Sequence, residues 1–341
     1  MAPRTQLARE MEFPPATPQP NVFPLSWHQG TEKMEEIWTA SQREVWDPAL
    51  LSWDTFDPES YTWEEREAIA YWWTLLSVFD ASAPPVFAEA LIKTYEVHEE
   101  DAVRRCFFSV TRDEQNHEQM CGMAITKMLG YPDPLTYEPK TDLGMLAQRN
   151  AKWLYFNGGR YWEGYRQAVP KYPLAVLFSS FLMGEIAAAT IFHQMADGAR
   201  ETVFQEAFTN IGRDEGRHMA ICMSLMERDY PKLDVSDRSL ITKQIRAGYL
   251  FLSAVLFEPP ADFWDLPDDF IVVQRRCEAV ARDAGFHIPE YDAKRENWRQ
   301  AILNLKAVLD KYDIPFPAIP EVDITGEEVN DVDLDDIIPV F

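Results

Sequence analysis

The chain has 341 residues, of which 46% are hydrophobic and 26% are charged. This balance is typical of a globular protein with a sizeable core. The formal net charge of -24 creates a field that repels phosphate backbones and anionic lipids, so nucleic acids and acidic membrane surfaces are excluded as preferred partners. Metal cations and basic molecules suit this charge better.

Two sequence features indicate the cellular compartment of the protein. The first 20 residues lack the apolar segment of a secretory signal, and no later stretch has the roughly 18 uninterrupted apolar residues of a membrane span. We therefore expect a soluble, cytoplasmic protein. The cysteines have no CxxC spacing and are too few to staple so long a chain, so we expect them to be reduced; they are Cys106, Cys121, Cys222 and Cys277.

Apolar periodicity along the chain predicts an all-α fold with no strand. A proline-rich arm, extended or disordered, is expected over 1–25, a helical domain over 26–315 and an acidic, solvated tail over 316–341. Pro84 and Pro85 are expected to interrupt a long helix near its middle. The predicted helices cover 32–46, 61–81, a stretch from 86 onward, 99–129, 141–156, 174–196, 200–228, 237–257, 269–284 and 291–311.

One pattern occurs twice, Arg-Asp-Glu-x-x-His at 112–117 and again at 213–218. The offset is 215 minus 114, or 101 residues, and the apolar positions around both copies largely match, which indicates an internal pseudo-repeat. In each copy Glu and His occupy consecutive positions of the apolar stripe, so both side chains point into the core. The paired residues are Glu114 with His117 and Glu215 with His218.

Buried carboxylates are costly unless a cation compensates them. A Glu and a His three residues apart share one helix face and can converge on one ion. Oxygen and nitrogen donors without thiolate favour iron or manganese over structural zinc. The sequence therefore predicts a two-metal centre between four helices, against the alternative of two buried ion-pair networks.

Such a centre needs one more carboxylate from each neighbouring helix. Glu185 fits the second half, because a hairpin turn near Gly198 brings it level with Glu215. For the first half, bringing Asp80 level with Glu114 requires a hairpin turn near residue 97, before the acidic start of the next helix. Bringing Glu89 level with Glu114 requires a turn inside that helix. The expected position of the turn favours Asp80 as the ligand, with Glu89 as the alternative ligand.

These motifs resemble a ferritin-like branch that contains the small subunit of ribonucleotide reductase and related ligand-binding oxidases. The resemblance rests on Trp46-Asp47-Pro48, on Gly184-Glu185-Ile186 and on the repeated motif, and it spans roughly 35–230. It implies six metal ligands, namely Asp80, Glu114, His117, Glu185, Glu215 and His218. It also implies that Asp214 holds a ligating imidazole and that Trp46 lies on an electron path, where the alternatives are a helix-cap or surface aspartate and a core tryptophan.

The chain departs from each known relative. The radical tyrosine of reductase small subunits corresponds to Cys121, and the valine and tyrosine that cross-link in the ligand-binding oxidases correspond to Ser82 and Ser180. The motif also resembles p-aminobenzoate N-oxygenases, whose additional histidine is replaced by Ile211, and acyl-carrier desaturases, whose basic docking surface this charge does not offer.

Together these features predict an oxidase or oxygenase that uses two iron ions, or one manganese and one iron, to activate dioxygen against a mostly apolar organic substrate. We expect a reductase or ferredoxin as electron donor, and a homodimer. The alternatives are a radical-generating subunit, which the acidic tail ending in Phe341 would dock to a larger partner, and a ferroxidase or iron-storage protein. The candidate pocket walls are Phe107, Val110, Phe181, Phe208 and Ile211.

Overall fold

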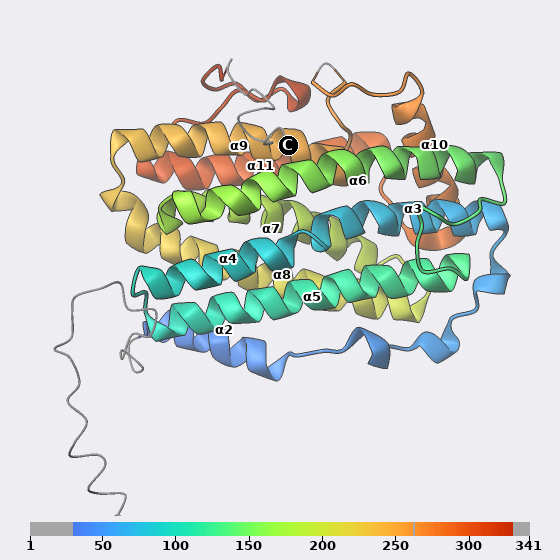
Figure 1. The fold of residues 1–341 in the computed structure, drawn as a ribbon, viewed down its shortest axis with the longest axis horizontal. Helices are drawn as coiled ribbons and strands as arrows, with labels where there is room; N and C mark the ends of the chain where they lie inside the picture. The colour runs from blue at the N-terminus through green and yellow to red at the C-terminus, as the bar shows by residue number, and fades with distance from the viewer. Residues whose placement is uncertain (1–29, 262, 330–341) are drawn as a thin grey trace, which may run out of the picture.

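The computed structural model describes residues 30–261 and 263–329, and within them the fold is helical with no strand, only two isolated β-bridges near the C-terminal end. The predicted arm over 1–25 lies outside the described residues. Figure 1 shows the long helices lying along one common direction. Their bounds are α2 Glu32–Arg43, α3 Trp63–Asp80, α4 Ala83–Glu96, α5 Asp101–Leu129, α6 Asp142–Ala168, α7 Leu174–Ala196, α8 Thr202–Asp229, α9 Val235–Leu256, α10 Phe270–Ala281 and α11 Tyr291–Leu309.

Local sequence signals set several helix ends. Thr62 and Glu65 form a reciprocal capping box at the start of α3, which satisfies backbone N–H groups that lack a helical partner. At the same end of the bundle, α5 stops at Gly130, which adopts a left-handed conformation with φ of 65°. Glycine adopts this conformation without steric cost. These ends fix the lengths of the two helices that carry the first half of the repeat.

The break between α3 and α4 lies slightly earlier than the sequence predicted. We expected the helix to resume at residue 86, but α4 already begins at Ala83. Pro84 and Pro85 therefore lie in the first turn of α4, where a missing backbone N–H costs nothing because that group has no helical acceptor. As a result, Asp80 is the last residue of α3 and faces the bundle at the break.

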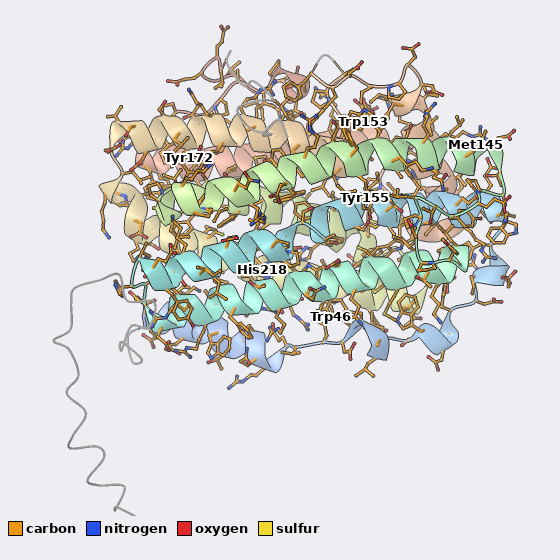
Figure 2. All side chains as sticks on the ribbon, viewed as in Figure 1. Trp46, Met145, Trp153, Tyr155, Tyr172 and His218 are labelled. Carbon is orange, nitrogen blue, oxygen red and sulfur yellow. The ribbon has the colours of Figure 1, made fainter. Side chains whose placement is uncertain are left out.

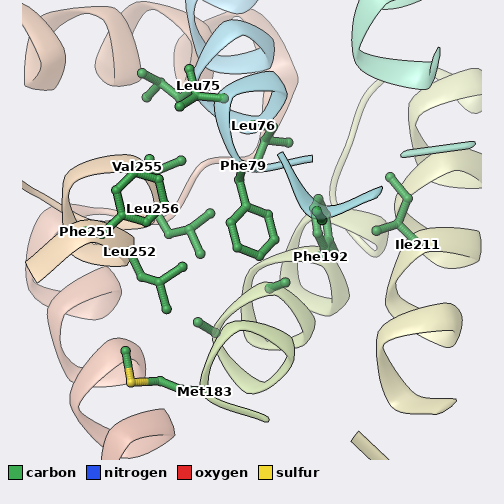
Figure 3. Close-up of a cluster of buried hydrophobic side chains, with 14 of the residues drawn as sticks. Leu75, Leu76, Phe79, Met183, Phe192, Ile211, Phe251, Leu252, Val255 and Leu256 are labelled. Atoms are coloured by element: carbon green, nitrogen blue, oxygen red, sulfur yellow. The ribbon is translucent and has the colours of Figure 1, made fainter. Parts of the chain in front are cut away.

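Two antiparallel hairpins form the centre of the bundle. In one, α3 and α4 together pack along α5, and in the other α7 packs along α8. The helix α2 packs on α5 and α8, while α6, α9, α10 and α11 cover the remaining sides (Figure 1). Figure 3 shows part of the apolar core, where Leu76 and Phe79 of α3 lie near Phe192 of α7 and Phe251 of α9.

Two expectations outside the central hairpins were wrong. The helix predicted over 141–156 continues to Ala168. The tail, expected to be solvated from residue 316, packs onto the domain up to about residue 324, because Phe316, Ile319 and Val322 are buried and Glu321 pairs with Arg246 on α9. The acidic residues of this segment predicted exposure to solvent, but the apolar residues between them anchor it to the domain. Residues 330–341 lie outside the described part.

Two apolar stretches, Trp63–Glu96 and Leu174–Ala196, are long enough to cross a membrane by length and composition. Most of each lies buried inside the bundle, 61% and 72% of the most apolar window respectively. Helices that are enclosed by others are apolar all round, and Glu185 interrupts the second stretch. Both are core helices, so they are only weak evidence for a membrane span.

Candidate metal centre

Six buried side chains from four helices meet in the middle of the bundle. α5 and α8 each contribute one Glu and one His of the repeated motif, α3 contributes its last residue, and α7 contributes a residue from its middle. They form two ligand groups that share Glu114: Asp80, Glu114 and His117 in one, and Glu114, Glu185, Glu215 and His218 in the other. Every member is at most 3% exposed.

The imidazole of His218 faces three carboxylates through Nδ1. This atom lies 3.2 Å from Glu185 Oε2, 3.3 Å from Glu114 Oε1 and 3.5 Å from Glu215 Oε2. These separations are too long for strong hydrogen bonds to all three at once, but they suit donors arranged around one ion. The second half therefore offers three carboxylates and one imidazole to a single point.

The first half has a similar arrangement, in which His117 faces carboxylates through Nδ1. His117 Nδ1 lies 3.5 Å from Glu114 Oε2 and 3.6 Å from Glu215 Oε1. Each of these two glutamates therefore presents one oxygen to His117 and the other to His218. Carboxylates in this position can bridge two ions, as in other four-helix di-metal sites.

The far nitrogen of each imidazole faces the Asp of the opposite motif copy. His117 Nε2 lies 3.3 Å from Asp214 Oδ2, and His218 Nε2 lies 3.5 Å from Asp113 Oδ2. A carboxylate on this side fixes the ring orientation and keeps the proton on Nε2, so that Nδ1 is free for a metal. The family resemblance implied this role for Asp214, whereas Asp113 was not predicted, although both motif copies contain the aspartate.

Arg217 and Trp46 hold the two aspartates. The Arg217 guanidinium donates to Asp214 and lies 3.3 Å from Asp113 Oδ2, so it neutralises both carboxylates. The indole Nε1 of Trp46 donates to Asp214 Oδ2 at 2.7 Å, and its ring centre lies 6.3 Å from that of His117. In Figure 2, His218 is seen between α4 and α5, and Trp46 lies beyond α5 on the side of the chain that follows α2.

Several atoms of the cluster lack a hydrogen-bond partner within the described residues. These orphaned, buried atoms are Asp80 Oδ1, Glu114 Oε2, His117 Nδ1, Glu215 Oε1, Glu215 Oε2 and His218 Nε2. Unsatisfied buried polar atoms are rare in folded proteins and require an explanation. All but His218 Nε2 face the interior of the cluster, where cations would satisfy them. The donor set therefore fits two iron or manganese ions.

The electrostatics point the same way. Burial raises the pKa of Asp80 to about 7, and burial together with Glu185 raises the pKa of Glu215 well above its usual range. Burial opposes a charge on Glu114 too, but hydrogen bonds from His117 and His218 outweigh it and lower its pKa to about 2. Without a metal, protons must therefore stay on part of the cluster to limit repulsion among its carboxylates.

The two candidates for the first carboxylate lie in different surroundings. Asp80 belongs to the cluster, whereas Glu89 lies outside it and pairs with Arg166 of α6 at 2.9 Å. Cys121, at the position of the radical tyrosine, donates its thiol to Asp80 Oδ2 at 3.1 Å. All four cysteines are free and buried. The serines at the cross-link positions make other hydrogen bonds, Ser82 to Val78 and Ser180 to Gln244.

A cavity of about 40 Å³, part of it open to solvent, adjoins the second ligand group. Glu114 and Glu185 form part of its wall, and the rest is mainly aromatic and aliphatic. Of the predicted pocket walls, only Phe181 lines this cavity; Phe107, Val110, Phe208 and Ile211 are buried core. The sequence missed the main walls because they come from α6 and α9, outside the repeat: Tyr161, Trp162, Tyr165, Gly248, Phe251 and Leu252.

Comparison with known proteins supports this architecture. No protein-family model and no curated protein matches the chain in sequence. Among solved structures, a mutant R2-like ligand-binding oxidase with an aerobically reconstituted Mn/Fe cofactor is 17% identical, with a TM-score of 0.53 over 84% of this chain and 98% of that one. The same kind of oxidase after photoconversion is 16% identical, with a TM-score of 0.52 over 83% and 94%. The chain therefore has the ferritin-like fold of R2-like ligand-binding oxidases, as the sequence predicted.

Proposed function

We propose that this protein is a di-metal oxidase or oxygenase that activates dioxygen and oxidises a small, mostly apolar organic molecule. The observation that carries the proposal is the six-residue cluster itself, whose buried atoms lack partners and whose second half opens onto an apolar cavity. Two reduced iron ions, or one manganese and one iron, would supply the electrons that reduce dioxygen. One oxidase of similar fold carries an aerobically reconstituted Mn/Fe cofactor.

The protein's own residues have distinct tasks in this proposal. Asp80, Glu185 and the two histidines would each hold one ion, while Glu114 and Glu215 would bridge both. Asp113 and Asp214 keep the imidazoles oriented. The largely apolar wall of the cavity would limit bulk water on the side where substrate would enter, which protects a reactive centre from side reactions.

Two other functions were expected as alternatives. A radical-generating subunit needs an oxidisable tyrosine beside the first half, and Cys121 occupies that place. An iron-storage protein needs a cage of small bundles, whereas this bundle carries α9, α10 and α11 around the central hairpins. We therefore favour the oxidase, with a reductase or ferredoxin as electron donor and a homodimer as the expected assembly.

The direct test is metal reconstitution. Metal-free protein is loaded without oxygen with iron(II), or with manganese(II) and iron(II) together, and then exposed to oxygen. We expect two bound ions per chain by elemental analysis, anomalous diffraction peaks at both ligand groups, and oxygen uptake that requires the metals. Protein that contains no metal after expression with ample iron and manganese, and that takes none up on reconstitution, would contradict the proposal. A cage in gel filtration would favour storage.

A further inference from the structure

The cavity beside Glu185 contains two hydrogen-bond donors without an acceptor. Tyr165 Oη and Trp162 Nε1 are both shielded from solvent and have no hydrogen-bond partner within the described residues, and both residues line the cavity. Ser180 also lines the cavity and donates its hydroxyl proton to Gln244 Oε1 at 3.3 Å, and no hydrogen bond joins its oxygen to Tyr165 Oη. Buried donors are costly when unpaired, so this pair requires an acceptor that the protein itself does not provide.

The two donors come from neighbouring positions of one helix. Trp162 and Tyr165 lie three residues apart on α6 and therefore share a helix face. Their ring centres are 5.9 Å apart and the rings are nearly perpendicular. Burial raises the pKa of Tyr165 well above its usual range, so its hydroxyl keeps its proton at every ordinary pH and remains a donor.

The rest of the wall defines what carries the acceptor. Tyr161 and Phe251 stack with ring centres 4.0 Å apart, and Phe79 also contributes its ring; Figure 3 shows Phe79, Phe251 and Leu252 within one cluster of buried apolar side chains. Gly184 of α7 and Gly248 of α9 also line the cavity and add no side chain to it. Flat, apolar surfaces of this kind favour an aromatic or similarly compact apolar body.

The charge of the wall argues against an anion. No lysine or arginine lines the cavity among the described residues, and its only ionisable carboxylates are Glu114 and Glu185. The proposed metal ions would lie at Glu114 and Glu185 and not at the two donors of α6, and burying an anion beside these donors without a cationic partner is strongly unfavourable. A neutral acceptor such as a carbonyl oxygen avoids this cost and still satisfies an O–H and an N–H donor.

We infer that the cavity binds a neutral aromatic molecule with one carbonyl-type oxygen, which accepts hydrogen bonds from Tyr165 Oη and Trp162 Nε1. This inference rests on the proposed function, because it names the substrate class for the same site. Because Glu114 and Glu185 line the same cavity, a molecule held by the donors of α6 would lie beside the second ligand group.

The test uses a matched trio of probes, which are acetophenone, ethylbenzene and benzoate. Binding to the full-length chain is measured by titration calorimetry without oxygen, in metal-free and manganese-loaded protein. We expect acetophenone to bind about tenfold more tightly than ethylbenzene, the factor that one well-placed hydrogen bond supplies, and benzoate to bind most weakly. Because no oxygen is present, this result does not depend on whether the protein turns over, so failure here and failure of the proposed function are distinguishable.

Matched variants locate the effect. Tyr165→Phe removes one oxygen atom and should reduce the preference for acetophenone over ethylbenzene to within about twofold. Tyr230→Phe removes another buried hydroxyl that lacks a partner, at a position outside this cavity, and should leave the preference unchanged. Equal binding of the two neutral probes, tighter binding of benzoate, absence of any binding, or a preference that survives Tyr165→Phe would each overturn the inference.

Discussion

The two halves of the metal centre come from one repeated motif, but their remaining carboxylates have different surroundings. Asp80 ends a helix at a break, accepts a hydrogen bond from Cys121 and does not line the cavity. Glu185 lies in the middle of the unbroken α7 and forms part of the cavity wall. The repeat therefore sets the common ligands, whereas the helices outside the motif decide which half is closed and which is open to a substrate.

The largest expected effect concerns the residue that both halves share. Replacing Glu114 with alanine removes a carboxylate that faces both imidazoles, so both metal positions should weaken. Changes to residues that only support ligands already cost about 10–100-fold in affinity, and loss of a bridging ligand should cost more. We expect fewer than two ions per chain by elemental analysis, and no metal-dependent oxygen uptake.

Glu89→Ala is the matched control for this change. Glu89 is a glutamate on the neighbouring α4 that pairs with Arg166 outside the cluster. Its removal should cost at most about 1 kcal/mol of stability, as for other partly exposed ion pairs, and both ions should remain. A Glu114→Ala protein that still holds two ions would refute the ligand assignment.

A second comparison uses the crossed aspartates. Asp214→Asn should weaken the ion held by His117, and Asp113→Asn the ion held by His218, each by about 10–100-fold, because each imidazole then loses the group that orients it. Trp46→Phe removes only one hydrogen bond to Asp214 and should have a smaller effect. Metal titrations that resolve the two positions test this, and equal loss at both positions in either Asn variant would contradict the crossed arrangement.

Metal-free protein should lose stability as the pH rises. Asp80 and Glu215 have raised pKa values in the folded state, and those of His117 and His218 are raised by their carboxylate neighbours despite burial. In the unfolded chain these pKa values are about 4 for the acids and about 6.5 for histidine. Between each unfolded pKa and the higher folded pKa, the folded state binds more protons than the unfolded chain. Stability from all four groups is present at low pH and is lost as pH rises through this window.

Thermal unfolding at several pH values measures this effect. We expect the Tm of the metal-free protein to fall by roughly 3 °C or more between pH 5 and pH 8. Glu114, whose pKa is lowered to about 2, contributes the opposite slope only below about pH 4. The metal-loaded protein should not show the decline, because metal binding displaces the protons and strengthens as pH rises. The same decline in both forms would show that it arises elsewhere.

The sequence could predict those parts of the metal centre that depend on spacing within one hairpin. Helical spacing places Glu114 beside His117 and Glu215 beside His218, and turn arithmetic selects Asp80 over Glu89, because these relations lie within one hairpin. The cavity was missed, since Trp162, Tyr165 and Phe251 come from helices whose packing onto the hairpins has no signature along the chain. The buried segment around Ile319 was missed for a related reason, because its acidic neighbours dominate the local composition.

The smallest expected effect concerns the two cysteines that occupy equivalent positions in the repeat. Cys121 and Cys222 each follow the ligand histidine by four residues and are both buried. Only Cys121 donates to a cluster carboxylate among the described residues, at 3.1 Å to Asp80. Cys121→Ala should therefore leave Asp80 less well held and weaken metal binding in the first half by a few-fold.

Cys222→Ala makes the same change in the second half, where no such hydrogen bond is lost. Both variants should lose similar stability from the small cavity left by the sulfur, on the order of 1 kcal/mol. The difference between them in metal affinity therefore isolates the thiol–carboxylate contact. If both variants bound two ions with wild-type affinity, the two halves would differ only in their access to the cavity, and the thiol at position 121 would serve packing alone.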